Sequence, residues 1–155
     1  MTTRYTLPLK DLDEAFLKQL RAQHADAEVE IIINAGQSDA SPMSEEQFWA
    51  IINRLDRSKT GDDEAMLEPA VAFLAAQDVK HIYQFEDKLS EKLYALDRED
   101  FARAAMGNQP YFSVDKFLYL RACVVANGEQ VYNAILQNPE QMPEDITFEP
   151  LLWLA

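Results

Sequence analysis

One charged side chain in apolar surroundings is the first candidate for chemistry. Arg121 shares a helical face with Phe117 in an otherwise apolar segment. A buried charge without a partner is strongly destabilising, so this arginine needs an acceptor. Glu86 is the expected partner because it follows Phe85 and is placed on the apolar face of its predicted helix, with Asp97 and Asp115 as second choices. Two interpretations stay open: a buried ion pair that fixes helix register, or an arginine that binds an anion in a pocket, with one of these acids as acid, base or orienting group.

Four large aromatic side chains accompany these candidates. Trp49, Tyr94, Tyr119 and Tyr132 lie in or near the predicted helices of these residues and could line a cleft beside Arg121 and Glu86. The alternative is that they belong to the core and expose only their polar tips. The candidate ligand-binding residues are therefore Arg121, Glu86, Asp97, Asp115, Trp49, Tyr94 and Tyr119.

The residue types of the common catalytic and metal sites are scarce. His24 and His81 are the only histidines and lie far apart, so we expect no metal site. Cys123 is the only cysteine, sits in an apolar helical segment and is expected to be a buried thiol. No nucleotide-binding or hydrolase motif occurs, and the sequence predicts no cofactor.

The charge balance limits the possible partners. The chain has 14 basic and 27 acidic residues, a net charge of -13. Residues 1–40 hold 4 basic and 7 acidic residues, and residues 41–155 hold 10 and 20, so neither part offers a basic patch for phosphates. Direct nucleic-acid binding is not expected. Such acidity keeps a protein soluble and attracts basic partners.

The elements that must position these residues divide the chain in two. Residues 4–9 alternate polar and apolar types, residues 28–33 are rich in β-branched types, and Leu12, Phe16 and Leu20 recur between them at helical spacing. This pattern predicts a β-α-β unit over residues 1–34, followed by a linker over 35–42. The exposed sheet edge of such a unit could pair with a second copy, forming a homodimer.

Residues 43–155 carry a helical pattern throughout. Ser44 and Gln47 form a capping box, and further helices are expected after Asp78, Asp97 and Ser113. The six predicted helices carry the apolar stripes of residues 48–55, 66–74, 82–96, 98–106, 117–125 and 129–136. The apolar end, 150–155, is expected to fold back onto the domain.

The order of several segments resembles a bacterial family known as domain of unknown function 4240. The matching segments are residues 43–52, 85–89, 93–97, 115–122, 128–132 and 138–139. They span the helical part in the order typical of the family and leave the first 42 residues outside it. The resemblance implies a helical fold and assigns no activity.

Together these observations predict an α+β protein, mainly α, with an N-terminal β-α-β unit and a bundle of about six helices. With one cysteine, no signal peptide and no long apolar run, a cytoplasmic location without a membrane span is expected. The expected function is a non-enzymatic interaction or regulatory module, for example an antitoxin- or immunity-like protein that binds a basic partner. The alternative is a small-molecule or anion-binding sensor or enzyme that uses Arg121.

Overall fold

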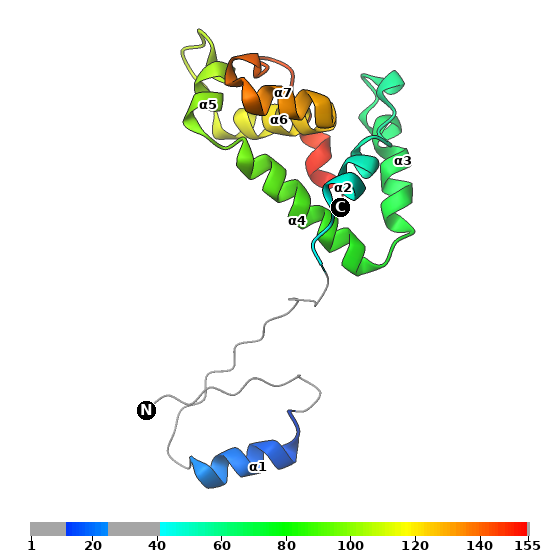
Figure 1. Cartoon of the computed structure of the whole chain (residues 1–155), viewed down its shortest axis with the longest axis vertical. Helices are drawn as coiled ribbons and strands as arrows, with labels where there is room; N and C mark the ends of the chain where they lie inside the picture. The colour runs from blue at the N-terminus through cyan, green and yellow to red at the C-terminus, as the bar shows by residue number, and fades with distance from the viewer. Residues whose placement is uncertain (1–11, 25–40, 155) are drawn as a thin grey trace. The chain divides into compact units, whose positions relative to one another are not determined.

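The described part of the chain is helical throughout. The computed structural model describes residues 12–24 and 41–154, and the chain divides into two units, residues 1–40 and 41–155 (Figure 1). Every regular element within the described residues is a helix, and they contain no strand. The predicted α+β class and β-α-β unit are therefore wrong: the described fold is all-α. Both segments predicted as strands, 4–9 and 28–33, lie outside the described residues; alternation over six residues gives a strand only when a second strand pairs with it.

The first unit contributes one described helix, α1 (Glu14–Gln23). Asp13 caps it, because its carboxylate accepts a hydrogen bond from the Phe16 amide at 2.8 Å. The helix predicted between residues 12 and 20 is thus present.

The second unit contains six α-helices and three short 3-10 helices. Their order is α2 (Glu45–Ile52), η2 (Arg57–Lys59), α3 (Asp63–Ala75), α4 (Val79–Ala95), α5 (Glu99–Met106), α6 (Val114–Ala126), α7 (Glu129–Gln137), η3 (Pro139–Gln141) and η4 (Glu149–Trp153). The six predicted helical segments are all present, because each carries an apolar stripe at helical spacing that can be buried against the others.

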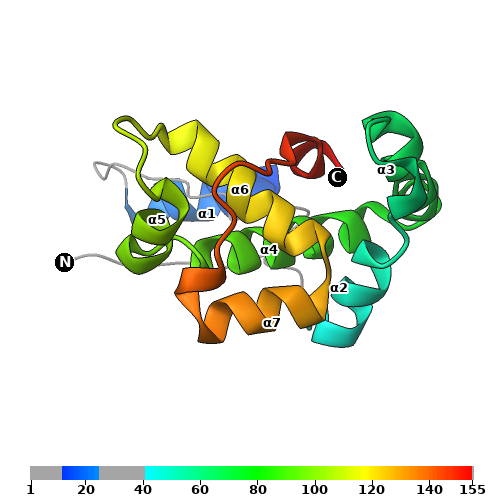
Figure 2. The same cartoon turned by 90° about the horizontal axis from the view of Figure 1, so that it is seen from above.

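The core is centred on α6, which contacts α4, α5, α7 and η4 (Figure 2). All residues from Leu120 to Ala126 are buried, and such a helix, apolar on nearly every side, must be surrounded by other elements. The long helix α4 packs Phe85, Leu89 and Leu93 towards this core. One face of α4 is therefore part of the core, and its opposite face is exposed to solvent.

Three of the six helices of the second unit start with a side-chain capping bond, and α4, α5 and α7 do not. Ser44 and Gln47 make the predicted capping box on α2, and Ser113 accepts a hydrogen bond from the Lys116 amide at the start of α6. Asp78 precedes α4 without a side-chain capping bond, and the residue before α5 is Arg98. Asp97 is therefore not the cap that the sequence predicted.

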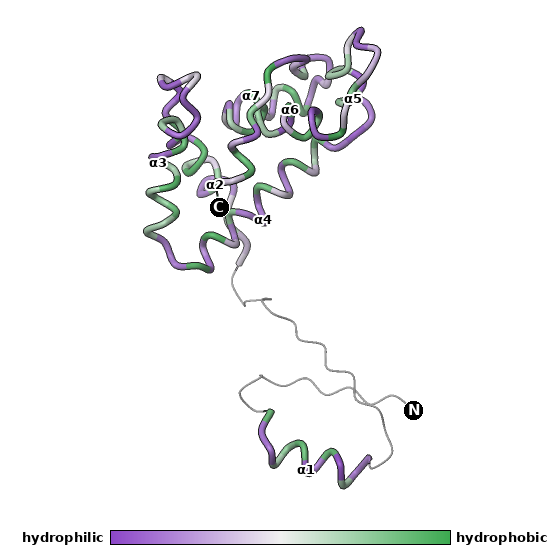
Figure 3. The backbone as a smooth tube through the Cα atoms, turned by 180° about the vertical axis from the view of Figure 1, so that it is seen from behind, coloured by the Kyte–Doolittle hydropathy of each residue, from purple (hydrophilic) through white to green (hydrophobic). Residues whose placement is uncertain are grey.

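The last segment folds back, as expected. In η4, which contacts α6 and α3, Leu151 is buried, as is Leu154 just after it. Figure 3 shows apolar and polar stretches alternating along most helices, as amphipathic packing requires.

Candidate functional site

Arg121 is held at the carboxyl end of α4. Its side chain projects from α6 and is only 7% exposed, and its Nη1 donates a 3.0 Å hydrogen bond to the backbone carbonyl of Leu93. This carbonyl also accepts a 3.3 Å hydrogen bond from the Leu96 amide, and carbonyls in the last turn of a helix carry partial negative charge, which a cation stabilises. The guanidinium also lies over the Phe117 ring, 4.7 Å from its centroid. The principal role of Arg121 in this geometry is to cap α4.

Asp97 supports this arginine only weakly. Its Oδ1 lies 3.6 Å from Nη1 of Arg121, which is too long for a hydrogen bond, and about half of its side chain is exposed. Burial lowers the pKa of Arg121, and the charge of Asp97 offsets part of that effect. Nε of Arg121 is buried without a hydrogen-bond partner in the described part of the chain. The arrangement is therefore a helix cap with a distant carboxylate, and not a fully paired ion pair.

The other two acids predicted for this site lie elsewhere. Glu86 is exposed on α4, and Asp115 is exposed in the first turn of α6. Neither forms an ion pair with Arg121 among the described residues. The structure brings Asp97 to Arg121 and leaves Glu86 and Asp115 apart from it.

The aromatic candidate residues also differ in their environments. Trp49 is buried, Tyr94 is 78% exposed and Tyr119 is half-buried. Partial burial, with the nearby charges of Glu149 and Asp115, raises the pKa of Tyr119. These three side chains do not line a common cleft with Arg121.

A polar cluster that the sequence did not predict joins α2, α4 and α7. We call it the Glu45 cluster, and it consists of Glu45, Trp49, Lys88, Lys92 and Tyr132. The Glu45 carboxylate lies 2.6 Å from Nζ of Lys92 and 3.1 Å from Nζ of Lys88, and it accepts a 3.2 Å hydrogen bond from Nε1 of Trp49. Its signal in the sequence is the spacing of four residues that separates Lys88 from Lys92 and Glu45 from Trp49.

The electrostatic interactions in the Glu45 cluster favour the charged forms of Glu45 and Lys88. Burial raises the pKa of Glu45, but hydrogen bonds and charge from Lys92 and Lys88 outweigh this effect and leave the pKa below its usual value. Burial lowers the pKa of Lys88, but Glu91 and Glu45 outweigh it and leave that pKa raised. Both lysine side chains are only 12% exposed. The cluster therefore ties α2 to α4, and Glu91 beside it supplies the second carboxylate that balances the two lysines.

Tyr132 completes this cluster from α7. Its hydroxyl donates a 3.0 Å hydrogen bond to the Lys92 carbonyl, and its ring lies 5.3 Å from both the Trp49 ring and the Lys92 Nζ. Burial, followed by the charges of Glu45 and Glu91, raises the pKa of Tyr132 to about 12. This tyrosine is a neutral structural donor at physiological pH.

The opposite side of α4 forms an exposed strip of acidic and aromatic side chains. We call it the α4 outer face, and it comprises Tyr83, Glu86, Asp87, Ser90 and Tyr94. Tyr83 is 63% exposed and Tyr94 is 78% exposed. The residues follow a spacing of three and four, so they share one side of the helix.

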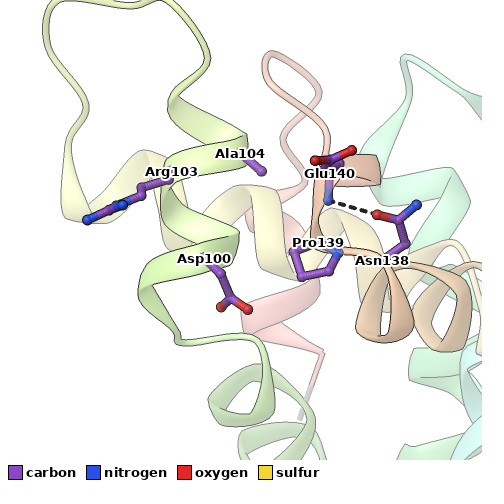
Figure 4. Close-up of a pocket in the computed structure, with 6 residues that line it drawn as sticks. All are labelled: Asp100, Arg103, Ala104, Asn138, Pro139 and Glu140. Atoms are coloured by element: carbon purple, nitrogen blue, oxygen red, sulfur yellow. Dashed lines mark hydrogen bonds between the residues drawn. The ribbon is translucent and has the colours of Figure 1, made fainter.

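The two surface hollows do not bring together side chains suited to catalysis or to binding an anion. The larger, about 550 Å³, lies between α5 and η3 (Figure 4). Its Arg103 side chain extends away from the others and pairs with Glu99, and Asp100 pairs with Arg98. The smaller, about 230 Å³, is mainly apolar and includes Cys123, whose thiol pKa is raised by burial despite a hydrogen bond from Asn127. Neither hollow contains Arg121.

The family assignment agrees with this helical arrangement. Residues 43–155 match the family described as "Protein of unknown function (DUF4240)". The chain belongs to this family. The resemblance noted in the sequence is thus confirmed, and the DUF4240 description assigns no activity. The match covers the whole of α2 to η4 and leaves α1 outside.

Other comparisons add no relatives. No curated protein and no solved structure matches the chain. In the described ranges 12–24 and 41–154, no helix combines the length and apolar character needed to cross a membrane, and no three side chains of metal-binding type gather.

Proposed function

We propose that this protein is a non-enzymatic interaction module that binds a basic partner. An antitoxin- or immunity-like protein that covers a basic surface is one specific case. The observation that carries the proposal is the unequal pairing of charges in the second unit.

Most cations of the second unit are paired with acidic residues of the same unit. Residues 41–154 hold 10 basic and 20 acidic residues, a net charge of -10. Six carboxylates in this range form ion pairs, and the other 14 form none with any described residue. The six paired acids are Glu45, Glu91, Asp97, Glu99, Asp100 and Asp145.

Four cations of residues 41–154 form no ion pair: Lys59 and Lys80 are exposed, and the two arginines make other contacts. Arg54 lies over the Phe73 ring at 3.9 Å, and Arg57 donates a 2.8 Å hydrogen bond to the Ala126 carbonyl. The surface therefore carries a surplus of carboxylates without cations of its own. Such a surface steers positively charged partners and repels nucleic acid.

The arrangement of Arg121 argues against the alternative of an anion-binding sensor or enzyme. One guanidinium nitrogen is already committed to the Leu93 carbonyl, and the side chain lies outside both hollows. A thermal-shift screen with phosphate, acetate and nucleotides tests this directly. We expect no shift, and a concentration-dependent rise in melting temperature that Arg121→Met abolishes would favour the alternative.

Affinity capture tests the proposal itself. The full chain, immobilised at about 50 mM salt, is exposed to an extract of its own cells, and each captured protein is purified and its binding measured separately. We expect a basic protein whose affinity falls steeply with salt. A partner that is acidic, or a basic one whose affinity is unchanged at about 500 mM salt, would contradict the proposed electrostatic role.

A further inference from the structure

We infer that the α4 outer face is the docking surface of the proposed module, and that the docked segment of the partner presents arginine side chains. This inference rests on the proposed function and adds to it a location and the chemistry of the partner.

The α4 outer face is set apart by the way α4 distributes its charges. Lys88 and Lys92 turn towards α2, where both pair with Glu45, and Lys88 also pairs with Glu91 of α4. Glu86 and Asp87 lie on the outer side and form no ion pair with any described residue. The outer side of the same helix therefore keeps two carboxylates without partners. It also carries one exposed cation, Lys80, three residues before Tyr83, so its net charge is negative.

Two tyrosines make this face more than an acidic surface. The rings of Tyr83 and Tyr94 are largely exposed and have no aromatic, cationic or hydrogen-bonded partner in the described ranges. They are 11 residues apart on a continuous helix, a separation of about 16 Å along its axis. Glu86, Asp87 and Ser90 lie between them. An aromatic ring at each end thus borders a polar, negatively charged centre.

Arginine matches this combination better than other side chains. A guanidinium stacks flat on an aromatic ring and can bind a carboxylate with two parallel hydrogen bonds, whereas a lysine ammonium does neither as well. Two arginines about 16 Å apart, roughly 11 residues along a helix or five along an extended strand, would engage both tyrosines together.

Other occupants are disfavoured by charge. A second copy of the α4 outer face would place Glu86 and Asp87 against the same carboxylates, and like charges at an interface are repulsive. A wholly apolar segment would desolvate these carboxylates without pairing them. The face is also well supported, because Arg121 caps the end of α4 one residue before Tyr94.

Peptide binding to the full chain tests the inference. The probes are two helical peptides that are identical except that one carries two arginines 11 residues apart and the other two lysines. We expect the arginine peptide to bind at about 50 mM salt and the lysine peptide to bind about fivefold more weakly. Equal affinities would contradict the arginine specificity.

Two double variants locate the binding surface. Tyr83→Ser with Tyr94→Ser, and Glu86→Gln with Asp87→Asn, should each weaken the arginine peptide about tenfold or more. All four side chains are exposed, so the melting temperature should stay close to that of the original protein.

Matched controls lie on other helices and loops. Glu64→Gln with Glu68→Gln removes the same charge from exposed, unpaired positions of α3, and Tyr111→Ser removes a tyrosine that is 78% exposed, as Tyr94 is. These variants should change affinity by no more than about twofold. If the control variants and the α4 variants weaken binding equally, the α4 outer face is not the docking surface, and the proposal of an acidic interaction module is unaffected. If the original chain binds neither peptide and captures no basic protein, the proposed function fails as well.

Discussion

Arg121 shows how a buried charge can be satisfied mainly by backbone. Its hydrogen bond to the Leu93 carbonyl joins α6 to the end of α4, while Asp97 remains half-exposed at 3.6 Å. A hydrogen bond from a charged donor contributes about 1.5–3 kcal/mol, and an exposed ion pair contributes about 0–1 kcal/mol. The carbonyl should therefore matter more than the carboxylate.

Substitutions of Arg121 and Asp97 should separate the contribution of the Leu93 carbonyl from that of the Asp97 carboxylate. Arg121→Met keeps much of the packing on Phe117, relieves the unpaired Nε and loses the cap, so we expect a net loss of about 1–2 kcal/mol in the free energy of unfolding. Asp97→Asn should cost about 0.5 kcal/mol or less, and Glu86→Gln should change nothing measurable. Denaturant unfolding measures all three. Equal losses of unfolding free energy for Arg121→Met and Asp97→Asn would mean that the ion pair, and not the hydrogen bond to Leu93, stabilises the contact between α6 and α4.

Tyr132 should make stability depend on alkaline pH. Its pKa rises from 10.0 in the unfolded chain to about 12 in the folded protein, so between these values the unfolded chain releases a proton that the folded protein keeps. The stability that this group contributes is complete below pH 10 and is lost towards pH 12, at no more than about 1.4 kcal/mol per pH unit. Tyr132→Phe should show a shallower decline over this range in denaturant unfolding. An unchanged slope would show that the hydroxyl is not protected from ionisation.

At the scale of elements, the Glu45 cluster determines how α2 packs on α4. Glu45 is the first residue of α2, and it contacts two lysines from the last half of α4. Neither lysine is more than 12% exposed, so removing the carboxylate leaves poorly hydrated charges behind. The cluster therefore contributes more than an ordinary surface ion pair.

Glu45→Gln should destabilise the protein, by about 1 kcal/mol near neutral pH, while keeping an acceptor for Trp49. The lowered pKa of Glu45 means that its contribution is present above the usual value of 4.5 and is lost as the pH falls through the lower folded value. The variant should therefore lose less stability on acidification than the original protein. The neighbouring Glu46→Gln is the matched control, since Glu46 is exposed and forms no ion pair in the described part of the chain. Equal effects of the two substitutions would contradict the role of the cluster.

At the scale of the whole molecule, the second unit has its own hydrophobic core. The buried residues of α2 to η4 form one continuous cluster, with aromatic contacts such as Phe48 to Phe85 at 5.4 Å. A continuous core of this kind is what an independently folding domain requires.

A fragment of residues 41–155 should therefore fold without the first unit. We expect a single cooperative thermal transition and a helical circular dichroism spectrum, with a melting temperature within a few degrees of the full chain. A broad, non-cooperative transition would show that the first unit is needed to complete the second.

The sequence by itself determined the helices of the second unit and the family to which they belong. Caps such as Ser44 and Ser113 and the apolar stripes are local signals, so they fix where helices begin and which side is buried. The strands predicted in the first 34 residues rested on local alternation and on a run of β-branched residues, and the described residues form only helices.

Tertiary structure decided the environment of the candidate site. The sequence indicated that Arg121 needs an acceptor, but the acceptor is a backbone carbonyl 28 residues away. Every residue has such a carbonyl, so no residue type marks the one that packing selects. The Glu45 cluster was missed for a related reason, because pairing Glu45 with Lys92 depends on how α2 lies against α4. Only the packed helices determine which charges are neutralised inside the protein and which remain on the α4 outer face.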